Sequence, residues 1–113
     1  MAFKLLALKY DLAEFDKQLG ENYWSPVDVA RVNDWMLRIA AFKDEFHWHS
    51  HEHDEWFYVY SGAITIDTEE GPIELSEGQG TVIPKGAQHR PRAVNRAVVL
   101  MFDPVEANLK GDA

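Results

Sequence analysis

Histidine at every second position is the feature that most constrains this chain. Four of its five histidines lie in the run His47-Trp48-His49-Ser50-His51-Glu52-His53, and Glu55 continues the same spacing. Side chains at positions i and i+2 of a β-strand share one face, so this spacing predicts that these groups point the same way. Converging imidazoles and a carboxylate are ligands for a divalent transition metal. The run therefore predicts extended chain that carries a metal site, which the remote His89 could complete from another strand.

Composition limits the ligands and the partners. The chain has 113 residues, which suits one domain and is too short for two ordinary ones. It contains no cysteine, so disulfides, thiolate ligands and cysteine nucleophiles are excluded. The formal net charge of −8 argues against nucleic acid and anionic membranes as partners, because both bind clustered Lys and Arg.

The apolar segments are too short to suggest a membrane span. None approaches the roughly 20 apolar residues that a transmembrane helix needs. The apolar run near the N-terminus is interrupted by Lys4 and Lys9 and continues into charged sequence, which is not typical of a signal peptide. We therefore expect a cytoplasmic protein with no membrane partner.

Turn residues divide most of the chain into short segments. Leu12, Phe15 and Leu19 recur at helical spacing, which predicts a short N-terminal helix over about 10–19. The expected strands cover 27–32, 35–42, 46–51, 55–60, 63–68, 73–75, 80–83, 89–94 and 97–102. This pattern predicts an all-β sandwich or barrel as a single domain over 1–113, with its core over roughly 27–103. The tail from residue 103 is expected to be an irregular strap or a frayed end.

Two motifs in this order give the chain a family resemblance. The first is His49-x-His51-x3-Glu55-x6-Gly62, and the second is Gly78-x5-Pro84-x-Gly86-x2-His89. In spacing and separation they resemble the two motifs of small single-domain cupins, of the kind often labelled mannose-6-phosphate isomerase-like. The resemblance covers roughly residues 35–103. Two positions depart from the family pattern, because Lys43 and Ala93 replace a usual glycine and asparagine.

The resemblance implies both a fold and a ligand set. The fold would be a double-stranded β-helix, a jelly-roll cupin barrel with a short N-terminal helix. The metal ligands would be His49, His51, Glu55 and His89, which leave about two positions free on an octahedral ion. Three imidazoles and one carboxylate suit Fe, Mn, Ni, Zn or Cu, so the sequence leaves the metal's identity open.

The remaining histidines have less defined roles. His47 shares the inward parity of the ligands, and it is the candidate catalytic residue, as a proton shuttle or a substrate contact. It could equally lie before the strand enters the cavity. His53 falls in an expected turn and is predicted to be exposed to solvent. By alternation, Arg90 and Arg92 face away from His89 and are expected to form surface ion pairs.

An aromatic stripe suggests that the sheet is covered on its outer face. Trp56, Tyr58 and Tyr60 have the opposite parity to Glu55, and they are too apolar for a free surface. Either a second copy of the chain, in a homodimer, or the N-terminal segment would cover them.

Two functions from different classes fit these residues. The first is a metalloenzyme that acts on a small molecule, of dioxygenase, isomerase or lyase type. The alternative is a non-catalytic, metal-supported binding module for a sugar or a small organic acid. The sequence offers no obvious acid or base outside the ligand set, which keeps the alternative open. Fold analogy alone assigns no reaction.

Overall fold

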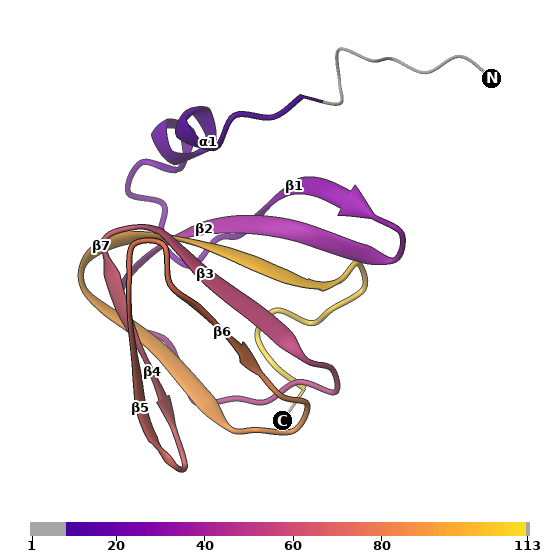
Figure 1. Ribbon diagram of the computed structural model, residues 1–113, viewed down its shortest axis with the longest axis vertical. Coiled ribbons are helices and arrows are strands. Elements are labelled where there is room, and N and C mark those ends of the chain that lie inside the picture. Colours follow the sequence, from indigo (N-terminus) through magenta and orange to yellow (C-terminus); the bar gives the residue numbers. More distant parts are fainter. Residues whose placement is uncertain (1–8, 113) are drawn as a thin grey trace.

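The computed structural model describes residues 9–112, which form one short helix and seven strands (Figure 1). In chain order these elements are α1 (Leu12–Leu19), β1 (Val27–Val32), β2 (Trp35–Glu45), β3 (Glu55–Ser61), β4 (Ala63–Thr68), β5 (Gly71–Ser76), β6 (Gly80–Ile83) and β7 (His89–Pro104). All strand pairs are antiparallel. The prediction of an all-β jelly roll with a short N-terminal helix is therefore confirmed.

The long strand β7 joins the two parts of the barrel. Its first half pairs with β4, and its second half pairs with both β2 and β3. The sequence suggested two separate segments, 89–94 and 97–102, but they form one strand with a bend between them. At this bend the register against β2 shifts, since Phe42 lies opposite Ala97 and Asp44 lies opposite Ala93. The exposed residues 94–95 lie within this bulge.

The predicted strand over 46–51 is wrong. Residues 46–54 form an irregular loop, in which only His49 makes an isolated bridge with His89. The two residues exchange backbone hydrogen bonds of 3.0 and 2.9 Å. A third backbone hydrogen bond runs from Gly86 N to His51 O over 2.9 Å. The histidine run is therefore held beside the start of β7 by a few specific bonds, without a full ladder.

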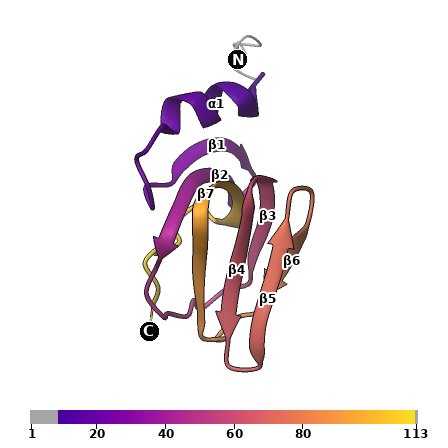
Figure 2. The ribbon, with the colours of Figure 1, turned by 90° about the vertical axis from the view of Figure 1, so that its left-hand side faces the viewer.

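Helix α1 covers part of the outer face of the sheet (Figure 2). Asp11 caps its N-terminus by accepting a hydrogen bond of 2.9 Å from Ala13 N. Leu19 and its helical neighbours pack in one apolar cluster with the half-buried stripe Trp56, Tyr58 and Tyr60. Arg96 also holds the helix, through Asp16 Oδ1 at 2.7 Å. The N-terminal segment thus contributes to covering this face.

The C-terminal tail is a strap that crosses back over the barrel. Val105 N donates to Asp34 O over 2.9 Å at one end of the strap. At the other end, Asp112 N donates to Ser50 O over 2.7 Å, and Asp112 Oδ2 accepts from Glu52 N over 2.8 Å. The strap therefore reaches the histidine loop, and the tail is not frayed over the residues that the structure describes.

Candidate metal centre

The structure brings together the four residues that the two motifs single out. His49, His51, Glu55 and His89 each offer one ligand atom, and these atoms all lie within 4.8 Å of one another. All four side chains are buried. His49 and His51 come from the irregular loop, whereas Glu55 and His89 are the first residues of β3 and β7. The site is thus assembled at one end of the barrel, where two strands begin.

Backbone carbonyls orient two of the imidazoles. His49 Nδ1 lies 2.9 Å from His47 O, and His89 Nδ1 lies 2.9 Å from Ala87 O. A carbonyl oxygen only accepts hydrogen bonds, so each Nδ1 carries the proton. In the neutral ring, Nε2 then keeps its lone pair for a metal. These contacts fix both the ring orientation and the tautomer that coordination requires.

The donor atoms inside the cluster lack hydrogen-bond partners. Both ring nitrogens of His51, His89 Nε2 and Glu55 Oε1 are buried without one. Glu55 Oε1 lies 3.4 Å from His51 Nε2 and 3.5 Å from His89 Nε2, which is close for charge pairing but long for a hydrogen bond. Buried polar groups without partners are costly, and a cation between these atoms would satisfy them together. The residues present therefore fit a divalent metal.

The electrostatics of the cluster favour deprotonated ligands at two positions. Burial lowers the pKa of His49 to about 4. Burial opposes the charge on Glu55, but its contacts with His51 and His89 outweigh this effect and lower the pKa of Glu55. For His51, burial lowers the pKa while the nearby Glu55 carboxylate raises it, and the net shift is upward. A bound cation would replace the proton on His51.

A buried ion pair lies beside the site, and sequence reasoning missed it. Asp103 is fully buried and receives a hydrogen bond from Arg38. Trp56 on β3 pairs with Phe102 on β7, so Glu55 and Asp103 are cross-strand neighbours on the interior face. Burial and the nearby Glu55 raise the pKa of Asp103. Asp103 is a charged residue at an inward-facing position in the otherwise apolar end of β7, and this position is the feature of the sequence that could have indicated the ion pair.

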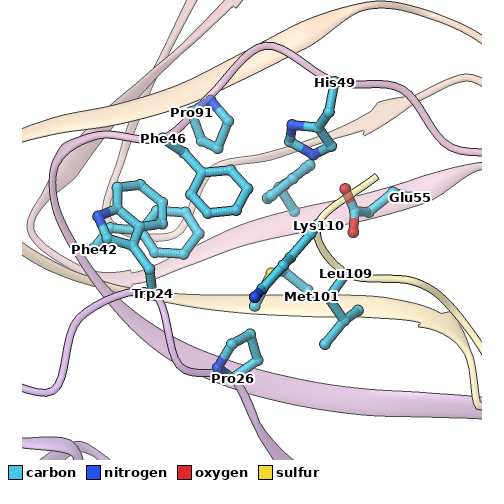
Figure 3. A pocket seen from close by; sticks show the side chains of 11 residues that line it. Trp24, Pro26, Phe42, Phe46, His49, Glu55, Pro91, Met101, Leu109 and Lys110 are labelled. Carbon is cyan, nitrogen blue, oxygen red and sulfur yellow. The ribbon is translucent and has the colours of Figure 1, made fainter. Parts of the chain in front are cut away.

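An apolar cavity of about 200 Å³ adjoins the four-residue cluster (Figure 3). His49 and Glu55 border it at one side, and Phe42, Phe46 and Trp24 form an aromatic wall. The ring of Trp24 stacks on those of Phe42 and Phe46, with centroid distances of 4.2 and 5.1 Å. The remaining lining residues are Pro26, Phe57, Pro91, Met101, Leu109 and Lys110. A small molecule could thus reach the cluster through a mostly apolar space.

The other two histidines lie outside the four-residue cluster. His47 is exposed, so the expected inward parity is wrong. Its Nε2 lies 2.6 Å from Lys110 O on the strap, and its ring lies 5.2 Å from that of His49. His53 was expected to be exposed, but it is half-buried, and its ring stacks on His51 at 4.9 Å. The irregular path of the loop breaks the simple alternation of a strand, which explains the error at His47.

Arg90 and Arg92 behave as the sequence predicts. Both guanidinium groups bind the Asp67 carboxylate, at 2.9 and 2.8 Å, on the outer side of β7. Arg90 also pairs with Glu45 at 3.3 Å. These arginines are therefore engaged in surface ion pairs.

Among residues 9–112, no helix is long and apolar enough to cross a lipid bilayer.

Comparison with known proteins agrees with this architecture. The sequence matches the cupin domain family Cupin_2 over residues 35–103. It is 36% identical over 81 residues to the uncharacterized protein YdbB of Bacillus subtilis (strain 168), a match that covers 70% of this chain and 72% of YdbB. A cupin-2 domain containing protein from Shewanella frigidimarina has a similar structure, with a TM-score of 0.84, 29% identity, and coverage of 88% of this chain and 98% of that one.

A more distant structure shares the fold. It is a hydroquinone 1,2-dioxygenase from Sphingomonas sp. TTNP3 with 4-hydroxybenzoate bound, at a TM-score of 0.71 and 19% identity, covering 84% of this chain and 73% of that one. At this identity the likeness is one of fold. The two motifs, the jelly-roll topology and the family match over most of the chain agree, and the chain belongs to the cupin family.

Proposed function

We propose that this cupin binds one divalent transition metal through His49, His51, Glu55 and His89 and acts as a small-molecule metalloenzyme. The observation that carries the proposal is a set of buried, unpartnered donor atoms beside an apolar cavity. The bound metal would supply Lewis acidity and open coordination positions for a small molecule. Fe, Mn, Ni, Zn and Cu all remain compatible with three imidazoles and one carboxylate.

The chain's own residues would prepare the site in three ways. The carbonyls of His47 and Ala87 hold two imidazoles in the required tautomer. The aromatic wall keeps water away from the reacting molecule, which strengthens electrostatic interactions there. His47, exposed at the rim beside His49, would exchange protons with solvent, which is the catalytic role proposed for it.

The lining narrows the class of substrate. A sugar carries many hydroxyl groups, and each needs a hydrogen-bond partner when it is buried. Among the described residues that line the cavity, three bring a charged or imidazole side chain, namely His49, Glu55 and Lys110. It therefore disfavours the sugar that the sequence left open, and with it an isomerase that acts on sugars. The proposal favours a dioxygenase- or lyase-type reaction on a mostly apolar molecule.

A binding module for a small organic acid is the second candidate. One observation favours it: with His49 and Glu55 as metal ligands, no other carboxylate or imidazole among residues 9–112 lines the cavity to act as general base. Such a module would hold its ligand unchanged. An enzyme would instead convert the bound molecule and consume or release a co-substrate.

The test begins with protein purified without a tag. Elemental analysis and native mass spectrometry should find about one transition metal per chain, and they identify any small molecule that is retained. Oxygen uptake and product formation are then measured with that molecule, for the metal-loaded chain and for His89→Ala. Loss of both metal and turnover in His89→Ala supports the enzyme, whereas an intact bound ligand without turnover supports the module. A chain that takes up no transition metal contradicts both.

Two further expectations stay proposals. We propose a homodimer, which would cover those parts of the Trp56, Tyr58 and Tyr60 stripe that α1 leaves half-exposed. We also propose a cytoplasmic location. Sedimentation equilibrium of the full chain and of Tyr58→Glu tests the homodimer. A dimer that persists in this variant would place the dimer contact elsewhere.

A further inference from the structure

The cavity has polar groups on two sides of an apolar space. His49 and Glu55 lie on one side, and Lys110 reaches in from the C-terminal strap (Figure 3). The Lys110 side chain extends across the pocket toward Pro26, with its amine directed away from Glu55. Most of the surface between these groups is aromatic or aliphatic. A ligand that satisfies both sides would need an apolar body and two polar ends.

The size and shape of the space favour a single flat ring. An apolar cavity of about 150 Å³ is enough to hold benzene. The cavity here measures about 200 Å³, so it has room for one six-membered ring with small substituents. The rings of Trp24, Phe42 and Phe46 line one side of this space and give such a ring an aromatic surface to pack against.

Lys110 provides an available positive charge at this cavity. Among residues 9–112 its ammonium group makes no ion pair or hydrogen bond. The chain carries a formal net charge of −8, so a local cation is needed for an anion to bind. Lys110 is exposed, and its flexible stem carries a compact positive charge that a carboxylate at the rim of the cavity can meet.

The backbone of the strap fixes where Lys110 begins. Its carbonyl oxygen lies 2.6 Å from His47 Nε2. The next residue, Gly111, packs on the His49 ring so closely that an added Cβ would lie 2.5 Å from His49 Cβ. Gly111 also has a φ of 103°, which other residues rarely adopt. The strap thus packs against His49 of the four-residue cluster, and it places the Lys110 side chain over the pocket.

We propose that this pocket selects a small, flat, apolar ring that carries one carboxylate, and that Lys110 recognises the carboxylate. The assignment rests on the proposed function, because the end of the ligand opposite its carboxylate faces the metal site of the four-residue cluster. It also gives the C-terminal strap a role in specificity. The ligand class is an aromatic acid with an oxygen substituent on the side away from its carboxylate.

Binding to the full chain loaded with zinc tests the assignment without turnover. The probes are 4-hydroxybenzoate and 4-hydroxybenzamide, which have nearly the same shape and differ in charge. Glucuronate serves as an acid on a hydroxyl-rich ring. Affinities are measured by isothermal titration calorimetry for the natural chain, Lys110→Gln, Lys110→Arg and Lys17→Gln. Lys17 lies exposed on α1, so Lys17→Gln removes the same charge at a position outside the pocket.

We expect the acid to bind about tenfold more tightly than the amide. A hydrogen bond to a charged group contributes enough binding free energy for a change in affinity of about this size. Lys110→Gln should abolish the preference, whereas Lys110→Arg and Lys17→Gln should keep it, and glucuronate should bind far more weakly. Equal affinity for acid and amide, or a preference that survives Lys110→Gln, overturns the assignment. If the chain still binds zinc and the amide, the ligand assignment fails while the proposed metal site remains supported. A chain that binds no zinc overturns both.

Discussion

The two faces of β7 carry charged groups that differ in how completely they are paired. On the outer face, Asp67 accepts hydrogen bonds from Arg90 and Arg92, and these contacts lower its pKa. On the inner face, His89 lies next to Glu55, yet the facing nitrogen and oxygen atoms have no hydrogen-bond partner. The exposed fraction is 15% for the Asp67 side chain and 4% for Glu55.

This difference separates an ion-pair cluster from a candidate binding site. The outer cluster is complete, because each charge meets its opposite and water can reach the group. The inner cluster is incomplete, because its buried nitrogen and oxygen atoms lie close together without hydrogen-bond partners, and an added cation would satisfy them together. Unpartnered buried atoms, more than the residue types, therefore distinguish the face of the strand that carries the candidate metal site.

Neutralising one carboxylate on each face of β7 should give the largest difference between the two clusters. Glu55→Gln should weaken metal binding on the order of 100-fold or more, since even residues that only orient a ligand typically contribute 10–100-fold. Asp67→Asn makes the same chemical change on the outer face and should leave metal affinity unaltered. Competition with a chelator measures both affinities, and equal losses in the two variants would contradict the distinction.

The buried ion pair next to Glu55 should make a large contribution to stability. Arg38→Met leaves the buried Asp103 without its guanidinium partner, which should cost about 3–5 kcal/mol of unfolding free energy. Arg31→Met, which changes an exposed arginine, should have little effect. Urea unfolding of the metal-free chain measures both changes. The double variant Arg38→Met with Asp103→Leu should recover much of the loss, and failure to recover would show that packing of Arg38 dominates.

The metal-free site should also make the fold sensitive to acid. Burial lowers the pKa of His49 to about 4, below its ordinary value of 6.5. The unfolded chain therefore takes up a proton first, and the free energy of unfolding should fall as the pH drops from about 6.5 to 4. His49→Gln removes this contribution, so it should lose less stability over the same range. Urea titrations at several pH values compare the two chains, and parallel profiles would contradict the shift.

The outer cluster should give the smallest effect. Asp67→Asn should cost about 1 kcal/mol or less, because the ion pairs are partly exposed and screened by water. The cost should shrink further in 1 M salt, where exposed charges are screened within about 3 Å. Thermal unfolding at low and high salt measures it. A larger cost that is insensitive to salt would mean that this cluster behaves like a buried one.

The motif spacing predicted the site better than the local structure around it. The distances between His49, His51, Glu55 and His89 along the chain identified the four residues that come together. The strand expected at 46–51 is wrong because His49 and His51 project from a loop held by the bridge to His89. Alternation thus gave the right neighbours for these two histidines and the wrong placement for His47.

Residues that depend on long-range packing could not be predicted. Trp24 lines the cavity from a loop position with a φ of 58°, outside any strand pattern. Arg38 and Asp103 meet only because β2 and β7 pair in a particular register, with Arg38 opposite Met101 and Asp103 opposite Met36. Lys110 reaches the cavity only because the strap folds back to Ser50. Each of these contacts joins segments whose separation along the chain hides their proximity.

X-ray absorption spectroscopy of the zinc-loaded full chain tests directly whether the four residues bind the metal. We predict three imidazole nitrogens and one carboxylate oxygen at about 2.0–2.2 Å, together with at least one exchangeable light-atom ligand. Glu55→Gln should alter this shell and Asp67→Asn should not. A shell with fewer than two imidazoles, or one that is identical in the natural chain and in a variant lacking His49 and His89, would contradict it.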